Sequence, residues 1–249
     1  MIHIFLRHCM NSEVSKHKQR PMEFNRETLF EKILHSLKGT QDSVELIVFL
    51  DTFKCKEVNT EHTHFTQEST REFKIVQKEC GSEANAFLNL LHHVKEQAYH
   101  KDDIIIFLED DYLVGDTWID VVKEGLYFAE YVTLYDHPDK YSSMYANLTT
   151  VIFKGSKKHW RTTPSTTNSY AMKVSTLLRD FAIHEEYSRG VKVTRDHEKF
   201  LALWKTSSLV SCIPGEWSHE EIGMQTSICG DSQKQIFEQG PNPMVTYFS

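Results

Sequence analysis

The stretch from Ile104 to Val114, IIIFLEDDYLV, contains the residues of this sequence best suited to do chemistry. An apolar run ends in three adjacent carboxylates, Glu109, Asp110 and Asp111. Such carboxylates repel one another, so they form either a solvated turn or a site for something positive. Mg²⁺ and Mn²⁺ prefer carboxylate and phosphate oxygens, and residues two apart on a strand point to the same side. We therefore expect Glu109 and Asp111 to face a divalent cation, with Asp110 directed to the other side or towards a sugar hydroxyl.

The sequence before this acidic triplet alternates apolar runs with helical patterns. Strands are predicted at HIFLRH, centred on residues 4–6, and at 44–51, 73–76 and 103–108, with helices at 25–37 and from 82 onward. This alternation predicts an α/β fold with a single Rossmann-like, mostly parallel sheet and helices on both faces. Ligands of such sheets bind at the carboxyl ends of strands, where Asp51 and the triplet would lie. Later segments predict helices at 118–129, 174–181 and 198–204, and strands at 132–135 and 209–213.

Composition restricts the class of protein. The 249 residues carry a net charge of −7, which argues against a broad nucleic-acid surface. The five cysteines lie far apart without a CxxC pair, as expected for reduced thiols. We recognise no signal peptide and no run long enough to span a membrane, so we expect a cytoplasmic protein.

The order of these elements resembles the GT-A fold of family 2-like glycosyltransferases over roughly residues 1–220. The resemblance rests on HIFLRH, the Asn25 helix, LIVFLD, FKIV, the Ser82 helix and IIIFLEDD, which ends where these enzymes carry a DXD motif. It implies one catalytic domain over 1–249, with a nucleotide-binding half (1–113), an acceptor and catalytic half (114–229) and an irregular tail (230–249). It also implies a glycosyltransferase that uses Mn²⁺ or Mg²⁺, a nucleotide-diphosphate sugar donor and a glycan or other hydroxyl acceptor.

The resemblance assigns roles to individual residues. Asp51 matches an Asp that meets the nucleotide base, and Glu109 and Asp111 match the acidic positions of DXD, with Asp111 as the direct metal ligand. His219, in the turn after LVSCI, matches a late metal-binding His. Asp196, in TRDHEKFLALW, matches a catalytic base, which implies inversion at the sugar. Asp51 and Asp196 are equally well placed to cap a strand end and a helix start.

Residue type alone suggests further contacts. Arg7, at the end of the first strand, could meet a phosphate, while Glu109 and Asp110 could meet the sugar nucleotide. Trp160 and Trp217 flank polar turns, where an indole either stacks on an acceptor sugar or packs in the core. The hydroxyl-rich loop 162–169 precedes the acceptor side.

The sequence also departs from the family pattern. The first strand ends in Leu6-Arg7-His8 instead of Pro-x-Tyr-Asn, and Glu stands at the first DXD position. A metal-dependent phosphohydrolase would also carry carboxylates at strand ends, but the haloacid type requires a second Asp after Asp51, and FLDTF lacks it. A non-catalytic protein that binds a sugar or nucleotide on the same scaffold is the other alternative.

Overall fold

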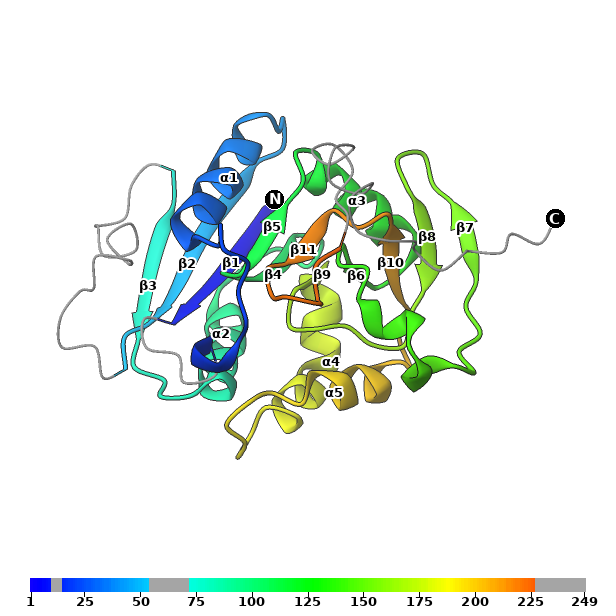
Figure 1. Ribbon diagram of the computed structural model, residues 1–249. Coiled ribbons are helices and arrows are strands. Elements are labelled where there is room, and N and C mark those ends of the chain that lie inside the picture. The colour runs from blue at the N-terminus through cyan, green and yellow to red at the C-terminus, as the bar shows by residue number, and fades with distance from the viewer. Residues whose placement is uncertain (10–14, 54–71, 227–249) are drawn as a thin grey trace.

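A computed structural model describes residues 1–9, 15–53 and 72–226 (Figure 1). Within that part of the chain, nine strands form one sheet in the order β3-β2-β1-β4-β9-β6-β10-β8-β7, and β5 pairs with β11 beside it. Most of the predicted loop at 52–72 and the whole predicted tail at 230–249 lie outside the described residues. The predicted α/β class is confirmed, because helices cover both faces of the large sheet.

The amino-terminal half is a parallel sheet, as predicted. Its strands are β1 (Ile2–Cys9), β2 (Val44–Asp51), β3 (Lys74–Lys78) and β4 (Ile104–Glu109), and neighbours among them run parallel. The helices α1 (Arg26–Lys38) and α2 (Glu83–Glu96) begin where Asn25 and Ser82 cap the backbone N–H three residues on. All four strands therefore end at the same edge of the sheet.

The carboxyl-terminal half is mixed. Its elements are β5 (Tyr112–Val114), α3 (Trp118–Phe128), β6 (Tyr131–Thr133), η3 (Pro138–Tyr141), η4 (Ser143–Tyr145), β7 (Ile152–Lys154), β8 (His159–Thr162), β9 (Tyr170–Lys173), α4 (Val174–Glu186), α5 (Asp196–Leu203), β10 (Leu209–Ile213) and β11 (Trp217–His219). One short helix, η1 (Ser15–His17), precedes α1. Strand β9 runs antiparallel between β4 and β6, and β8 and β7 extend the sheet with antiparallel pairs beyond β10. The five short strands β5, β7, β8, β9 and β11 were not predicted.

Alternation along the strands builds two cores. On β1, Ile4 and Leu6 point to the face covered by α1 and α3, whereas Phe5 points to the face covered by α2, α4 and α5. Phe107 on β4 lies beside Phe5 on that second face, with ring centroids 6.2 Å apart. The next residues with the Phe5 orientation are Arg7 and Glu109, so the same alternation delivers these two charges to one face. None of the helices in the described ranges is both long enough and apolar enough to cross a membrane.

Gly125 on α3 provides a sharp test of the second half of the fold. A Cβ at this position would lie 2.6 Å from Trp160 and 2.7 Å from Val132. Gly125→Ala should therefore destabilise the protein by about 1–3 kcal/mol in a denaturant titration, because the buried indole cannot retreat. In most helices the same change is stabilising.

Gly39 is the matched control. It has a helical φ of −84°, and an added Cβ would meet nothing closer than 3.8 Å. Gly39→Ala should leave stability unchanged or raise it by about 0.4–1 kcal/mol. A stabilising Gly125→Ala would contradict the packing of α3 on Trp160.

Candidate active site at the carboxyl edge of the sheet

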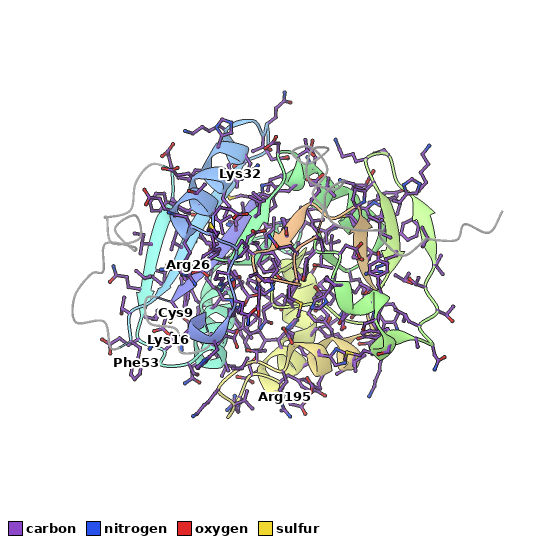
Figure 2. All side chains as sticks on the ribbon, viewed as in Figure 1. Cys9, Lys16, Arg26, Lys32, Phe53 and Arg195 are labelled. Carbon is purple, nitrogen blue, oxygen red and sulfur yellow. The ribbon has the colours of Figure 1, made fainter. Side chains whose placement is uncertain are left out.

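The acidic triplet lies where strand β4 ends and the chain turns into β5. Glu109 is the last residue of β4, and Asp110 and Asp111 form the turn. Figure 2 shows the edge where β1 and α1 contribute Cys9 and Arg26, with Lys16 of η1 in the same region of the view. The described residues around the triplet are strongly basic, and each of the three carboxylates has its own cationic partners.

Glu109 is paired with Arg7. The Nη2 of Arg7 donates to Glu109 Oε1 at 2.9 Å, and its Nη1 donates to Glu83 Oε1 at 2.6 Å. Burial acts to lower the pKa of Arg7, but these two carboxylates outweigh it and raise that pKa above its ordinary value. Arg7 therefore links β4 to the start of α2. In addition, Ser169 Oγ accepts a hydrogen bond from the backbone N–H of Glu109 at 3.1 Å.

Asp110 is turned away from Glu109 and paired with His8 and Arg26. His8 Nδ1 is in close contact with Asp110 Oδ2, and Arg26 Nε donates to the same oxygen at 3.1 Å. Burial would raise the pKa of Asp110, but His8 and Arg26 together lower it. The predicted contact with a sugar stays a prediction, and in this structure the carboxylate ties β1 and α1 to the turn.

Asp111 is the most enclosed of the three, with only 3% of its surface exposed. Its Oδ2 accepts from Lys18 Nζ at 2.7 Å and from Arg20 Nη2 at 2.9 Å, and lies 3.2 Å from His219 Nε2. Burial raises the pKa of Asp111, yet His219, Lys18 and Arg20 hold it well below the ordinary value. Its other oxygen, Oδ1, is buried without a hydrogen-bond partner in the described part of the chain.

His219 reaches Asp111 through the small second sheet. Strand β11 runs antiparallel to β5 with His219 opposite Tyr112, and the two rings stack with centroids 5.0 Å apart. The proximity of His219 and Asp111 that the resemblance implied is therefore present. Neither β5 nor β11 was predicted, so the pairing that creates this proximity is a finding of the structure.

The predicted metal-ligand set is only partly assembled. Asp111 and His219 lie together, but Glu109 is bound to Arg7 on another side of the turn. The ranges that the structure describes contain no group of three or more His, Cys, Asp and Glu side chains arranged to hold a metal ion. The residues present thus do not fit Mn²⁺ or Mg²⁺ as a ready-made ligand set, and the metal stays a prediction from sequence.

Asp51, which is predicted to meet a nucleotide base, is hydrogen-bonded to the backbone in this structure, and its contact with a base stays a prediction. Asp51 is 2% exposed, and its Oδ1 accepts from the backbone N–H of Phe53 at 3.0 Å and of Cys80 at 2.9 Å. Its Oδ2 lies 3.8 Å from Cys9 Sγ. The carboxylate caps the turn after β2 and holds the segment that leads to α2. This is the strand-end role that the sequence analysis gave as an alternative.

Trp160 and Trp217, the two acceptor candidates, lie in the core of this structure. Both side chains are fully buried. Trp160 Nε1 donates to Glu124 Oε2 at 3.0 Å, and Trp217 packs against Trp118 with ring centroids 5.8 Å apart. Neither indole presents a face to a ligand, because α3 covers both, so they serve the core.

Asp196 is the first residue of α5 and lies near the same edge. Its Oδ1 accepts from the backbone N–H of His197 at 2.7 Å. Burial raises the pKa of Asp196 above its ordinary value, although Lys199 one turn later acts to lower it. A carboxylate with a raised pKa is a better proton acceptor than an exposed one.

A hydrogen-bonded chain joins the Asp196 region to the acidic triplet. Glu83, which is bound to Arg7, also accepts from Thr194 N at 2.6 Å and from Asn168 Nδ2 at 3.2 Å. Lys199 donates to the amide oxygen of Asn168. Three hydrogen bonds thus lead from Thr194, just before α5, through Glu83 and Arg7 to Glu109 at the end of β4.

Lys199 is an unusual member of this chain. It is fully buried, with its ammonium over the rings of Phe87 and Tyr170. Burial lowers the pKa of Lys199 to about 7, against the raising influence of Asp196 and Glu83. Its charge near neutral pH therefore depends on these neighbouring carboxylates.

The hydroxyl-rich loop before β9 supports the site from inside. Thr163, Ser165, Thr166, Asn168 and Ser169 are all buried. Within this loop Thr167 Oγ1 lies 2.9 Å from the hydroxyl of Tyr112. The polar composition that resembles a flexible loop in the sequence serves here to hydrogen-bond the backbone and side chains around the triplet.

Apart from Arg7, the cations of the site were missed in the sequence. Lys18 and Arg20 belong to a dense basic run, KHKQR at 16–20, which follows the first strand almost immediately. The sequence signal for Lys18 and Arg20 is this basic run, because it follows a strand that ends beside the acidic triplet. Glu83 was also missed, and its place in the first turn of a helix gives no sign of its pairing with Arg7.

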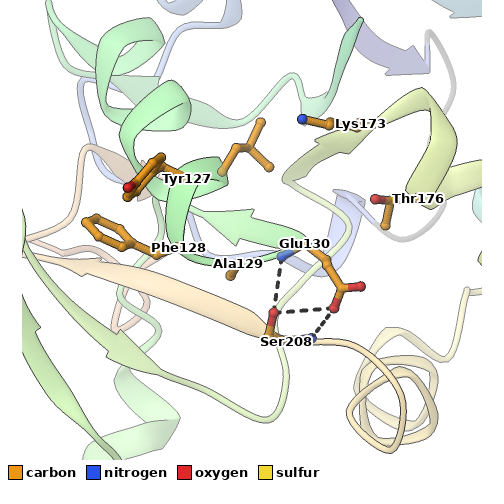
Figure 3. Close-up of a pocket in the computed structure, with 8 residues that line it drawn as sticks. Tyr127, Phe128, Ala129, Glu130, Lys173, Thr176 and Ser208 are labelled. Atoms are coloured by element: carbon orange, nitrogen blue, oxygen red, sulfur yellow. Dashed lines mark hydrogen bonds between the residues drawn. The ribbon is translucent and has the colours of Figure 1, made fainter. Parts of the chain in front are cut away.

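A pocket of about 290 Å³ lies elsewhere, at the amino ends of β6 and β10 (Figure 3). Its lining includes Tyr127, Phe128, Glu130, Lys173 and Ser208. Glu130 accepts from the backbone N–H of Ser208 at 2.9 Å, so this carboxylate staples two chain segments. The pocket is at the opposite end of the parallel strands from the triplet and brings together no predicted site residue.

Neither a known protein-family model nor a curated protein sequence matches this chain. Similar solved structures include S. aureus TarS 1–349, with 15% identity over 84% of this chain and 57% of that chain, at a TM-score of 0.45. The galactosyltransferase LgtC, in complex with donor and acceptor sugar analogues, has 7% identity over 84% of this chain and 72% of its own, at 0.48. A CMP:2-keto-3-deoxy-manno-octonic acid synthetase complexed with CTP has 11% identity over 86% and 92%, at 0.47.

This chain spans little more than half the length of the TarS structure. At such identities and TM-scores the likeness concerns general architecture, and it carries nothing about the substrate or reaction of this chain.

Removing Arg7 tests whether the site is a linked set of ion pairs. Arg7→Met should destabilise the protein by about 3–5 kcal/mol at neutral pH, because Glu83 and Glu109 then lack their common partner. The loss should shrink at acid pH, where protonated carboxyls need no counter-charge. Urea titrations at both pH values measure the effect.

Arg189→Met is the matched control. Arg189 pairs with Glu185 at 2.6 Å on the surface of α4, and 70% of its side chain is exposed. Such a pair contributes about 0.3–0.5 kcal/mol. Equal losses in the two variants would contradict a central role for Arg7.

Proposed function

We propose that this protein is a glycosyltransferase that moves a sugar from a nucleotide-diphosphate donor to an acceptor hydroxyl. The observation that carries the proposal is the edge where β1 and β4 end, because charged groups of both signs gather there. The segment just before the candidate base Asp196 is tied to them, since Thr194 donates to Glu83, which is bound to Arg7. Ligands of α/β sheets bind at this edge.

The residues divide the chemistry between them. A departing diphosphate needs positive charge, which Lys18 and Arg20 offer beside Asp111. The acceptor hydroxyl needs a proton acceptor in line with the sugar, and Asp196 has a raised pKa suited to that task. A base opposite the leaving group leads to direct displacement with inversion.

Asp51 is poorly placed to act as the nucleophile of a phosphohydrolase. A nucleophilic Asp after β2 would have to reach a phosphorus atom, whereas Asp51 is buried and hydrogen-bonded to the backbone. A non-catalytic binding protein would use the same cationic edge. A measurement of turnover distinguishes such a protein from a transferase.

Nucleotide binding is the first measurable consequence. At least one of UDP, GDP and TDP should stabilise the protein by about 2.7 kcal/mol at a concentration of 100 times Kd. For a chain of this size that is a rise in Tm of roughly 5–10 °C. The corresponding free nucleoside should shift Tm far less, because it lacks the diphosphate. Absence of a shift with all three diphosphates would remove the proposal.

Asp196 is tested by removing its charge while keeping its shape. Asp196→Asn should reduce transfer by about 10²–10⁴-fold while nucleotide binding stays within about twofold. Glu198→Gln changes an exposed carboxylate in the same helical turn and should leave transfer intact. Full transfer in Asp196→Asn would assign the base elsewhere.

The pH dependence follows from the direction of the Asp196 pKa. Because the base acts in its ionised form and burial raises its pKa, kcat/KM should fall on the acid side with an apparent pKa above 3.8, the ordinary value for Asp. The residual activity of Asp196→Asn should lack this acid limb. An acid limb of unchanged position in that variant would show that another group titrates.

A further inference from the structure

The ammonium of Lys18 lies where a cation shared by Asp111 and His219 would lie. Its Nζ is 2.7 Å from Asp111 Oδ2 and 3.1 Å from His219 Nε2, and these two acceptor positions are themselves 3.2 Å apart. Bonds from Mg²⁺ to its ligands are about 2.0–2.1 Å long. An ion bonded to both atoms would overlap the ammonium, so metal and Lys18 exclude each other.

The position of Lys18 is fixed by the two residues that follow it. Gln19 O accepts from the backbone N–H of Ile222 at 2.9 Å, and Arg20 Nη1 donates to Glu220 O at 2.7 Å. The basic run is thereby fastened to the segment that follows His219. The chain from which the Lys18 side chain extends to Asp111 is therefore held in place.

The surrounding charges favour a monovalent ammonium. Arg20 already contributes one positive charge to Asp111 Oδ2 at 2.9 Å, so a divalent ion beside it would meet repulsion from a close neighbour. Lys18 Nζ has three N–H groups, and two atoms lie within hydrogen-bond distance of it. The nearest further carboxylate, on Glu221, is 3.9 Å away, which leaves one N–H for an incoming oxygen.

Asp111 itself has capacity for another donor. Its Oδ1 is buried and has no hydrogen-bond partner among the residues that the structure describes, although the residue is almost fully enclosed. An unsatisfied carboxylate oxygen in such a place is rare in folded proteins. It points to a ligand group that completes the site, next to the cation that Lys18 provides.

We propose that Lys18, with Arg20 beside it, takes the place of a divalent metal at Asp111 and His219 and receives the diphosphate of the donor. The part of this inference that concerns the diphosphate rests on the proposed transferase function. The part that concerns the cation position does not, because exclusion of a metal by Lys18 can be measured without any nucleotide.

The first experiment titrates Mn²⁺ alone into the full chain by calorimetry. Lys18→Ala should gain a Mn²⁺ site that is at least about tenfold tighter than any site in the wild type, a change of the size that ligand-environment substitutions produce. The gain should vanish in the double variant Lys18→Ala/Asp111→Asn. Lys18→Met, which keeps the apolar stem, serves as a second variant if the alanine protein does not fold.

Lys123→Ala is the matched control for charge. Lys123 pairs with Asp42 at 2.8 Å and with Asp120 at 3.7 Å. Asp42 lies before β2 begins and therefore at the far end of the strands. The Lys123→Ala protein loses one positive charge and these two ion pairs, and it should bind Mn²⁺ as the wild type does. If the wild type and Lys18→Ala bind Mn²⁺ equally well, or if neither Lys18 variant gains a Mn²⁺ site, then Lys18 does not occupy a cation position.

The second experiment measures binding of UDP, GDP and TDP with EDTA or with Mn²⁺. The wild type should bind its preferred nucleotide equally under both conditions. Lys18→Ala should bind it about tenfold more weakly in EDTA and recover in Mn²⁺, because the metal then fills the place of the ammonium. A wild type that needs Mn²⁺ overturns the role of Lys18 in donor binding.

The two experiments test separate parts of the proposal. If no variant binds any nucleoside diphosphate under either condition, the transferase proposal fails together with the diphosphate role of Lys18. The Mn²⁺ titration still decides whether Lys18 holds the cation position between Asp111 and His219.

Discussion

Three consecutive carboxylates at the end of a buried strand are the constraint on which this structure depends. Removing an ion from water costs several kcal/mol unless opposite charges and hydrogen bonds replace the solvent. The described residues meet that requirement by distributing the triplet over three directions. Glu109 faces Arg7, Asp110 faces His8 and Arg26, and Asp111 faces a third basic group, formed by Lys18, Arg20 and His219.

This division also organises the chain around the sheet edge. Arg7 ties β1 and β4 to the start of α2, while Arg26 ties the start of α1 to the turn. The contacts of Arg20 and His219 bring the segment before α1 against the segment after β11. Parts of the chain some 200 residues apart are thus joined by the charges they must neutralise.

Much of the fold could be predicted because its signals are local. Long apolar runs became β2 and β10, and cap residues such as Asn25 and Ser82 marked the starts of α1 and α2. The short strands escaped prediction because three or four residues carry too little periodicity. Strand β9 runs antiparallel between β4 and β6, which only tertiary pairing determines.

The sequence pointed to the carboxylates of the triplet but to only some of their cationic partners. Asp111, His219 and Asp196 were found by position in the chain, but sequence spacing could not show that Asp51, Trp160 and Trp217 are enclosed. Burial of a side chain depends on elements packed over it, and for the two indoles the helix α3 provides that cover. The basic run at 16–20 carried a signal of composition, yet its contact with Asp111 depends on a path that no local pattern specifies.

The most direct measurement of this account is a crystal structure of the protein grown with Mn²⁺ and a nucleoside diphosphate, with diffraction recorded at the manganese absorption edge. The account predicts Lys18 Nζ within hydrogen-bond distance of Asp111 Oδ2 and of a phosphate oxygen, with no anomalous peak between Asp111 and His219. A manganese peak bonded to both residues, with Lys18 displaced, would contradict it.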